Sequence, residues 1–204
     1  PNGDVIIAGH TTSSDFPGFT LNETLSVGNN SRLFAARYSP QLELLSSSVL
    51  SGDGHIVAQD LLIDPDGLIY ITGSTNANDF PTSSNAWSKH LHHAEKPLVV
   101  DYGADSFIIA LDPTLKTIIS STLIGGARDD HAYQLGFDSK GNIIVAGNTG
   151  STDFPITHTM PTSTGLTPKY SNIFVSILNP ELSTLVNSTV WGSPTSDYFG
   201  AMHA

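Results

Sequence analysis

Three copies of one pattern run through this chain, and they limit its fold more strongly than any other feature. In each copy a glycine-bounded apolar run leads into an Asp-Phe-Pro turn. The turns are Asp15, Phe16 and Pro17, then Asp79, Phe80 and Pro81, and then Asp153, Phe154 and Pro155. Repetition at a spacing of some tens of residues indicates a solenoid, a propeller or another array in which each unit packs against its neighbours.

The second half of each unit repeats as well. An apolar run ends in a proline, and a glycine follows at the same distance each time: Pro40 and Gly52, Pro113 and Gly125, Pro180 and Gly192. This spacing predicts that the three glycines occupy equivalent positions.

Each unit has four short runs of strand-forming residues, which in the second unit are 68–73, 106–111, 117–124 and 132–138. They are rich in Ile, Val, Leu, Tyr and Phe, and Gly, Pro, Asn and Asp separate them, a pattern typical of strands. No long stretch shows the 3.6-residue period of a helix. The sequence therefore predicts an all-β fold, either a solenoid or a β-propeller made of four-stranded antiparallel blades.

We expect a single segment over residues 1–204, with repeat units at about 1–66, 67–140 and 141–204. The sequence opens in the middle of one hairpin and closes a few residues before the next is due. Because four blades are the usual minimum for a closed ring, we expect about three blades that form part of a larger propeller or array. Their open strand edges would pair with further blades or with another subunit.

The repeated residues also match a known pattern. The order Gly-x5-Gly-x-Thr-x3-Asp-Phe-Pro, then Phe-x3-Leu, then Ser-Thr-x2-Gly-Gly resembles the SBBP repeat, the "seven-bladed β-propeller" repeat of bacterial and archaeal proteins. The stretches 67–81, 107–126 and 141–155 match best. The resemblance implies a propeller on a secreted or cell-surface protein, and it implies no defined reaction.

Charge and composition exclude several classes of partner. Asp and Glu outnumber Lys and Arg by 19 to 8, which gives a net charge of −11. Nucleic acids and anionic membrane surfaces attract clustered basic residues, so neither is expected as a partner. The chain has no Cys, which excludes disulfides and Cys-ligated metals. No run is long and apolar enough for direct membrane insertion.

The Asp-Phe-Pro turns favour a structural role, because every unit has one. The Asp side chain can cap a turn, the Phe ring can pack between blades, and Pro fixes the chain as it leaves the strand. The alternative is a ring of ligand-binding or catalytic carboxylates, although catalytic residues need not recur in every blade.

The longest connection, residues 82–105, is a candidate metal site. Its His90, His92, His93 and Asp101 are donor types that suit Zn²⁺ or another divalent ion. A solvated polar loop explains the same residues, so both interpretations stay open.

Two hairpins carry oxygen donors that Ca²⁺ favours, at Asp64 and Asp66 and at Asp138 and Asn142. Neither completes a calcium-binding loop, and β-turns that use Asp and Gly for their backbone preferences explain both.

Residues 128–131, Arg-Asp-Asp-His, are the types that acid–base chemistry uses. Adjacent residues on a strand point apart, however. The sequence contains neither a Gly-x-Ser-x-Gly nucleophile elbow nor a phosphate-binding glycine loop. A catalytic role thus depends on how the fold arranges these side chains.

The variable loops at 18–31, 82–105 and 156–172 are the expected binding surface, because function tends to lie on loops over a rigid scaffold. Their aromatic residues Trp87, Tyr102 and Tyr170 could stack on a sugar or anchor a protein. Glycosylation sequons begin at Asn22, Asn29 and Asn187.

These features predict a non-enzymatic extracellular scaffold or binding module of a larger surface or secreted protein. Its partners would be proteins, carbohydrates or further copies of itself. Two alternatives stay open. One is a self-assembling filament or surface-layer subunit. The other is a secreted polysaccharide hydrolase or lyase, which would need two carboxylates facing each other in a cleft, about 5–10 Å apart.

Overall fold

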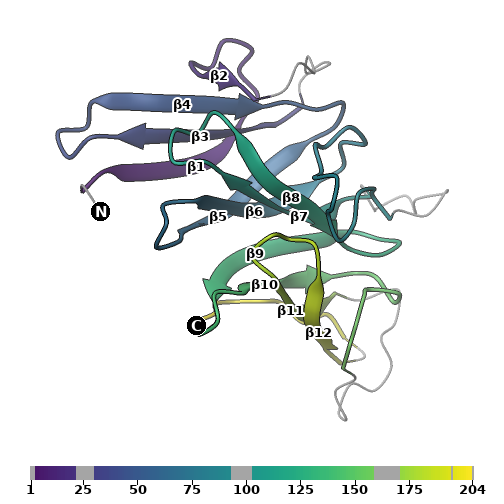
Figure 1. Cartoon of the computed structure of the whole chain (residues 1–204). Helices are drawn as coiled ribbons and strands as arrows, with labels where there is room; N and C mark the ends of the chain where they lie inside the picture. The colour runs from purple at the N-terminus through teal and green to yellow at the C-terminus, as the bar shows by residue number, and fades with distance from the viewer. Residues whose placement is uncertain (1–2, 22–29, 93–102, 159–170, 194, 204) are drawn as a thin grey trace.

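Strands make up the regular structure of this chain, for which the computed structural model describes residues 3–21, 30–92, 103–158, 171–193 and 195–203. In these ranges twelve strands form three sheets, which lie one below another in Figure 1. The predicted all-β fold is confirmed. The same ranges contain no helix with the length and apolarity to cross a membrane.

Each sheet is a small blade of neighbouring strands. The first has the order β1 (Val5–Thr11), β3 (Arg32–Tyr38), β4 (Leu44–Leu50) and β2 (Phe19–Thr20). The middle sheet has β5 (Ile56–Ile63), β6 (Ile69–Thr75), β7 (Asp105–Leu111) and β8 (Ile118–Ile124). The third has β9 (Asp130–Phe137), β10 (Ile143–Thr149), β11 (Asn172–Leu178) and β12 (Leu185–Trp191). All neighbours are antiparallel except the short β2, which runs parallel to β4.

The sheets begin one strand earlier than the repeat units expected from the sequence. The tight turns at Gly67 and Gly141, where φ is 89° and 81°, join antiparallel neighbours. The strand before each turn therefore belongs to the sheet that follows the turn. β9 thus pairs with β10, although the sequence grouping placed residues 132–138 at the end of the second unit.

The strands β5 and β9 tie neighbouring sheets together. At the start of each, a backbone N–H donates to a carbonyl just before the third strand of the preceding sheet. These bonds run from Ile56 to Ser31 at 2.8 Å and from Asp130 to Ala104 at 2.7 Å. After the third sheet, the N–H of Asp197 donates in the same way to the carbonyl of Ser171 at 2.8 Å. The last bond places residues 195–203, which form no strand, beside the third sheet as β9 lies beside the middle one.

The core consists of two apolar layers, one on each side of the middle sheet. Leu33 and Leu50 of the first sheet share one buried cluster with Ile109. Ile108 shares the other cluster with Phe174 of the third sheet. Because successive strand residues point to opposite faces, β6 and β7 are buried at every position. Burial on both faces explains their near-continuous apolar sequence.

The glycine that ends each repeated apolar run makes room for a neighbouring strand. β5 and β9 bulge beside this glycine. A Cβ on Gly73 would lie 1.9 Å from the carbonyl oxygen of Val57, and one on Gly147 would lie 2.0 Å from that of His131. No side chain fits at that distance, so the bulged strand requires glycine there.

The equal proline–glycine spacing gives a wrong equivalence in the first unit. The β3–β4 turn has one residue fewer than the β7–β8 turn, as the strand pairing shows. Gly52 therefore corresponds to Gly126 and not to Gly125. A Cβ on Gly52 would lie 2.9 Å from Asp79 Oδ1, and one on Gly126 would lie 2.5 Å from Asp153 Oδ1.

Candidate functional site

The aspartates of the Asp-Phe-Pro turns hold the loops between sheets. Asp79 Oδ1 accepts the backbone N–H of Asp53 at 2.9 Å. Asp153 Oδ1 accepts that of Ala127, also at 2.9 Å. Both donors lie in the loop that leads from the last strand of one sheet to the first strand of the next. These carboxylates are scattered over three units and form no common ligand set in the described residues.

The other two residues of the turn pack and anchor it. Each Phe ring contacts a Phe on the third strand of its own unit, with ring centroids 4.5, 5.1 and 4.6 Å apart in Phe16–Phe34, Phe80–Phe107 and Phe154–Phe174. Each Pro carbonyl accepts a serine hydroxyl from the last strand, from Ser47, Ser121 and Ser188. The motif thus builds the scaffold, and a functional site has to be sought among residues that differ between units.

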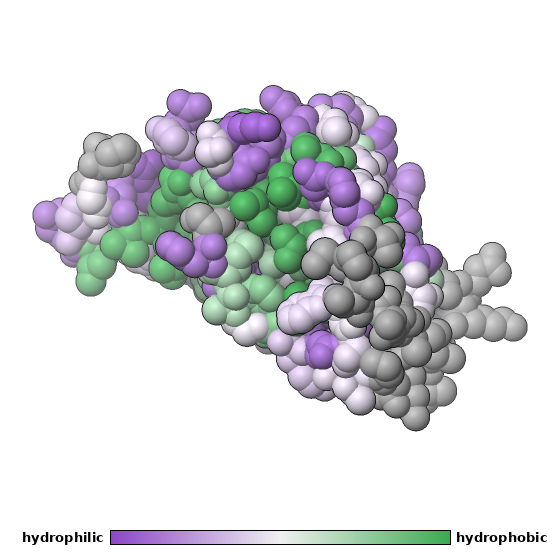
Figure 2. All heavy atoms as spheres, turned by 90° about the horizontal axis from the view of Figure 1, so that it is seen from below, coloured by the Kyte–Doolittle hydropathy of each residue, from purple (hydrophilic) through white to green (hydrophobic). Residues whose placement is uncertain are grey.

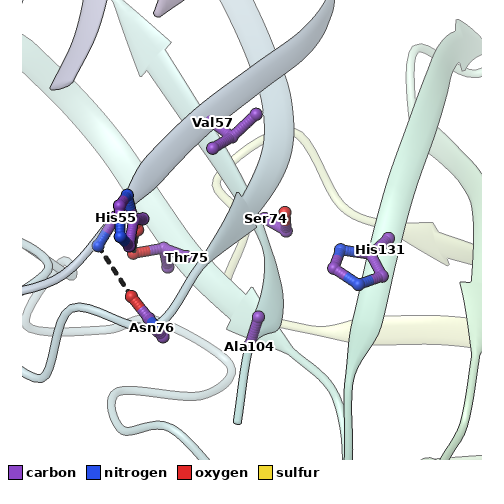
Figure 3. A pocket seen from close by; sticks show the side chains of 7 residues that line it. All are labelled: His55, Val57, Ser74, Thr75, Asn76, Ala104 and His131. Carbon is purple, nitrogen blue, oxygen red and sulfur yellow. Dashed lines mark hydrogen bonds between the residues drawn. The ribbon is translucent and has the colours of Figure 1, made fainter. Parts of the chain in front are cut away.

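A cavity of about 220 Å³ opens between the middle and third sheets (Figure 3). His55 and Val57 contribute from the β5 side, Ser74 and Thr75 from the end of β6, and His131 from β9. In Figure 3 the His131 ring stands across the cavity from the β5 and β6 residues. Burial lowers the pKa of His131. At neutral pH this cavity therefore presents an uncharged imidazole.

A second cavity, of about 380 Å³, lies along β9 and the segment 195–203. Gln59, Tyr133 and Gln134 line it from the first strands, and Tyr198 and Phe199 line it from the segment 195–203. Tyr198 is 76% exposed, so its ring is open to solvent. Burial raises the pKa of Tyr133, whose hydroxyl therefore stays protonated.

Stacked rings connect the two cavities. The His131 and Tyr133 rings have centroids 6.4 Å apart, and the Tyr133 and Phe199 rings lie 6.4 Å apart and only 8° from parallel. No Asp, Glu, Lys or Arg is among the described residues that line either cavity. Aromatic faces beside amide groups form a surface suited to an uncharged ligand that has both apolar faces and hydrogen-bonding groups. We call this row of rings and its two cavities the inner surface.

Two aspartates are buried close to this surface. Asp105 and Asp130 are both fully buried. They flank one glycine, since a Cβ on Gly125 would lie 2.5 Å from Asp105 Oδ1 and 2.9 Å from Asp130 Oδ2. Burial raises the pKa of Asp130 to about 7, although the Gly126 N–H and the Ser151 hydroxyl bond to its Oδ2 at 2.7 and 2.8 Å. A buried pair leaves no space for a sugar between the carboxyl groups, as polysaccharide hydrolysis would require.

The acid–base candidates at 128–131 do not converge. Asp130 is buried, whereas His131 faces the first cavity. Asp129 Oδ1 accepts the backbone N–H of Ala104 at 3.0 Å, and the Arg128 N–H donates to Ser151 Oγ at 2.9 Å. Alternation along the strand separates Asp130 from His131.

The candidate zinc residues fall partly outside the described residues, as His93 and Asp101 do. His90 is exposed. His92 has partners at both ring nitrogens, with Nδ1 3.1 Å from Asp105 Oδ2 and Nε2 3.3 Å from Ser88 Oγ. No group of three metal-ligating side chains occurs in the part of the chain that the structure describes. Zinc binding at this loop stays a prediction.

The calcium candidates hold their own hairpin turns. Asp64 Oδ1 accepts the Leu68 N–H at 2.8 Å, and Asp138 Oδ1 accepts the Asn142 N–H at 2.9 Å. The Asn142 side chain lowers the pKa of Asp138. The two turns lie around one cavity with Tyr70 and Phe137, and Asp66 also lines it. These carboxylates form the turn bonds expected of Asp in a hairpin.

The loop aromatics have different surroundings. Trp87 packs against the core between the middle and third sheets, and its backbone N–H donates to the Leu182 carbonyl at 3.0 Å. It therefore links two sheets and is not a free ring for stacking. Tyr102 and Tyr170 lie outside the described residues, as do the sequon residues Asn22 and Asn29. Asn187 lies on β12 and is exposed.

The residues of the inner surface were not predicted from the sequence. Val57, His131 and Tyr198 occupy equivalent positions, one residue after the anchoring N–H of Ile56, Asp130 and Asp197. The residue type at this position differs in each unit, and that variation could have indicated a binding position in the sequence. A scaffold position keeps its residue type from unit to unit, whereas a ligand-binding position need not. The bulge in β5 and β9 hid this alignment.

Comparison with known proteins agrees with the fold. A family model described as the beta-propeller repeat matches residues 50–81 and 121–155. Each matched stretch runs from the end of the last strand of one sheet to the next Asp-Phe-Pro turn, and so contains the first strand and the hairpin described above. No curated protein matches the chain. Two stretches of this chain, residues 50–81 and 121–155, are thus similar to the SBBP β-propeller repeat.

Proposed function

We propose that this chain is a binding and scaffold segment of a β-propeller displayed outside the cell, and that it binds neutral carbohydrate at the inner surface. The observation that carries the proposal is the row of His131, Tyr133 and Phe199 rings between two cavities lined without a charged side chain. The proposed binding surface therefore lies on the first strands of the sheets, β5 and β9, and not on the variable loops expected from the sequence.

The chemistry of the lining favours a sugar over a charged ligand. A pyranose ring presents C–H groups that pack on an aromatic face, and its hydroxyls bond to amides such as those of Gln59 and Gln134. Phosphorylated or sulfated ligands would bring charge to a surface without cations, in a chain whose net charge is −11.

A glycan array with neutral and acidic glycans tests this function. We expect neutral oligosaccharides to bind, Tyr133→Ala to weaken binding at least tenfold, and Tyr133→Phe to retain it. Trp191→Ala is the matched control, because this exposed ring lies on β12, far along the sheet from β9. Binding only to acidic glycans, or an equal loss in Trp191→Ala, would refute the proposal. If a protein partner binds and Tyr133→Ala weakens that binding, the ligand of the inner surface is a protein and not a carbohydrate.

The extracellular location rests on the composition and on the family. A composition with few charged residues and many Ser, Thr and Asn supports this location. Labelling intact cells of the source organism with a reagent that does not cross membranes should modify the native protein. Labelling only after lysis would contradict the extracellular location. It would not bear on carbohydrate binding, which the glycan array tests.

A specific observation favours self-assembly as the second candidate function. Leu42 is 70% exposed, whereas Leu115 and Leu182, which occupy the same turn position in the other units, are fully buried against the preceding sheet. On the same face Val5 is 43% and Ile7 40% exposed. Figure 2 shows hydrophobic side chains gathered in a band between hydrophilic margins in the view from below. The first sheet thus has an apolar face of the kind that packs between sheets elsewhere in the chain.

Sedimentation velocity distinguishes this candidate. If this face joins copies of the chain, the 204-residue polypeptide forms larger species as its concentration rises, and Leu42→Asp restores the monomer. A monomer at all concentrations would exclude self-assembly through this face and would leave the carbohydrate proposal untouched.

A further inference from the structure

Ser88, His92 and Asp105 form a hydrogen-bonded line in the second unit. Ser88 Oγ lies 3.3 Å from His92 Nε2, and His92 Nδ1 lies 3.1 Å from Asp105 Oδ2. His92 has the residue type of a metal ligand. In the structure its two ring nitrogens instead connect a hydroxyl to a buried carboxylate.

The surroundings favour one tautomer of the histidine. Asp105 is fully buried and also accepts the backbone N–H of His92 at 2.9 Å, which fixes the approach of the ring. A carboxylate at Nδ1 holds the proton on that nitrogen and leaves the lone pair of Nε2 toward Ser88. This is the arrangement in which a histidine acts as general base toward a serine hydroxyl. The hydrogen bond with Asp105 also raises the pKa of His92, which makes the ring a stronger base.

The serine is held by backbone bonds on the edge of the middle sheet. Its N–H donates to Thr122 Oγ1 at 3.0 Å, and its carbonyl accepts the N–H of Leu123 at 3.2 Å. Ser88 is 9% exposed, and the side chain of His92 is 42% exposed. The line therefore starts at a buried carboxylate and opens to solvent at the histidine.

The repeat shows that the fold does not need a carboxylate at position 105. The equivalent residue is Asn172 in the third unit and Arg32 in the first, because each begins the third strand of its unit. Asn172 is 2% exposed, and its Oδ1 approaches Gly192 as Asp105 Oδ1 approaches Gly125. An amide thus fills this position, whereas a buried carboxylate is costly unless it interacts with a specific partner. In the second unit that partner is His92.

We propose that Ser88 is an activated nucleophile, with His92 as its general base and Asp105 as the positioning residue, and that it accepts acyl groups from small esters. The serine Oγ forms a bond to the acyl carbon, and its proton passes to His92 Nε2. The ester C–O bond breaks, and the leaving alcohol takes the proton from His92. Water then hydrolyses the acyl-serine by the same route and releases the carboxylic acid.

The hydroxyl of Ser88 has a second acceptor, the carbonyl oxygen of His90 at 3.3 Å. Only the rotamer in which the O–H points to His92 Nε2 is reactive. The proposed activity goes beyond binding at the inner surface.

A fluorophosphonate probe tests the proposal, because an activated serine attacks its phosphorus and displaces fluoride. We expect mass spectrometry of the intact folded protein to find the probe on Ser88. Labelling should disappear in Ser88→Ala and in heat-denatured protein. Ser84→Ala, a change at an exposed serine of the same loop, should label like the wild type.

Two further variants separate chemistry from folding. His92→Gln alters a half-exposed ring and should lower the labelling rate at least tenfold without a change in melting temperature. Asp105→Asn copies the residue of the third unit and should have the same effect on the rate. Absence of probe on Ser88, or labelling unchanged in folded His92→Gln, would overturn the proposal.

Discussion

The backbone N–H of Leu135 in β9 donates to Asp60 Oδ2 in β5 at 2.8 Å, so a side chain of one sheet completes the backbone bonding of the next. The bond recurs one unit later, where the Met202 N–H donates to Gln134 Oε1. Both acceptors lie directly after the bulge of their strand. The bulges thus turn an amide or carboxyl oxygen toward the following unit, and the first strands are linked in series.

Removing this link should destabilise the chain. Asp60→Ala leaves the partly buried Leu135 N–H without its acceptor, and we expect a loss of about 1–3 kcal/mol in unfolding free energy. Asp60→Asn keeps an acceptor oxygen, as Gln134 does in the next unit, and should lose less than half as much. Urea unfolding followed by circular dichroism measures both. Equal stability of Asp60→Ala and the wild type would show that the link contributes nothing.

Substitution of the strand glycine should be far more damaging than substitution of a glycine in open space. A Cβ on Gly73 would lie 1.9 Å from the Val57 carbonyl oxygen, whereas nothing lies within 4 Å of one on Gly200. We expect Gly73→Ala to cost about 3 kcal/mol through overpacking and Gly200→Ala to be close to neutral. Thermal melting of the two variants gives the comparison, and similar melting temperatures would contradict the role assigned to the bulge.

The Phe of the Asp-Phe-Pro turn should contribute through packing. Phe80 is 4% exposed, and its ring centroid lies 5.1 Å from that of Phe107. Phe80→Ala should lose about 3–5 kcal/mol of unfolding free energy, and Phe80→Leu clearly less. If the alanine variant kept wild-type stability but lost ligand binding, the motif would be functional and not structural.

Stability should depend on pH through Asp130. Its pKa is about 7 in the folded chain, well above the ordinary 3.8. The folded state therefore holds this proton more tightly, and the stability it contributes is full below about pH 4 and is lost as the pH rises to 7. The loss is up to about 1.4 kcal/mol per pH unit. Asp130→Asn cannot titrate, so its stability relative to wild type should increase across this range. A constant difference from pH 4 to 8 would show that the Asp130 pKa is ordinary.

The repeat predicted the architecture because scaffold residues must recur in every unit. The Phe and Pro of the Asp-Phe-Pro turns are such residues: in all three units the Phe ring contacts a Phe of the third strand, and the Pro carbonyl accepts a serine hydroxyl. The repeat did not show which consecutive strands form one sheet, because a repeat has no intrinsic starting point. Only the hairpins at Gly67 and Gly141 decide which strands share a sheet.

The candidate sites were harder to predict, because they depend on contacts between units. Ser88 and Asp105 are separated by residues 89–104 in the sequence, and only the fold brings them to the two sides of His92. Tyr133 and Phe199 stack because segment 195–203 lies along β9. For Trp87 the prediction from the sequence was wrong: its loop position indicated an exposed ring, whereas the adjacent sheet partly buries it.

Above all, we propose that the inner surface of this propeller segment binds neutral carbohydrate. Amide-detected NMR of the folded chain, titrated with neutral pentasaccharides of glucose and of N-acetylglucosamine, tests it most directly. We expect the resonances of Tyr133, Gln134 and Phe199 to shift with a common saturation curve while those of β4 and β12 stay in place. Shifts confined to the 82–92 loop, or no shifts with any neutral glycan, would contradict it.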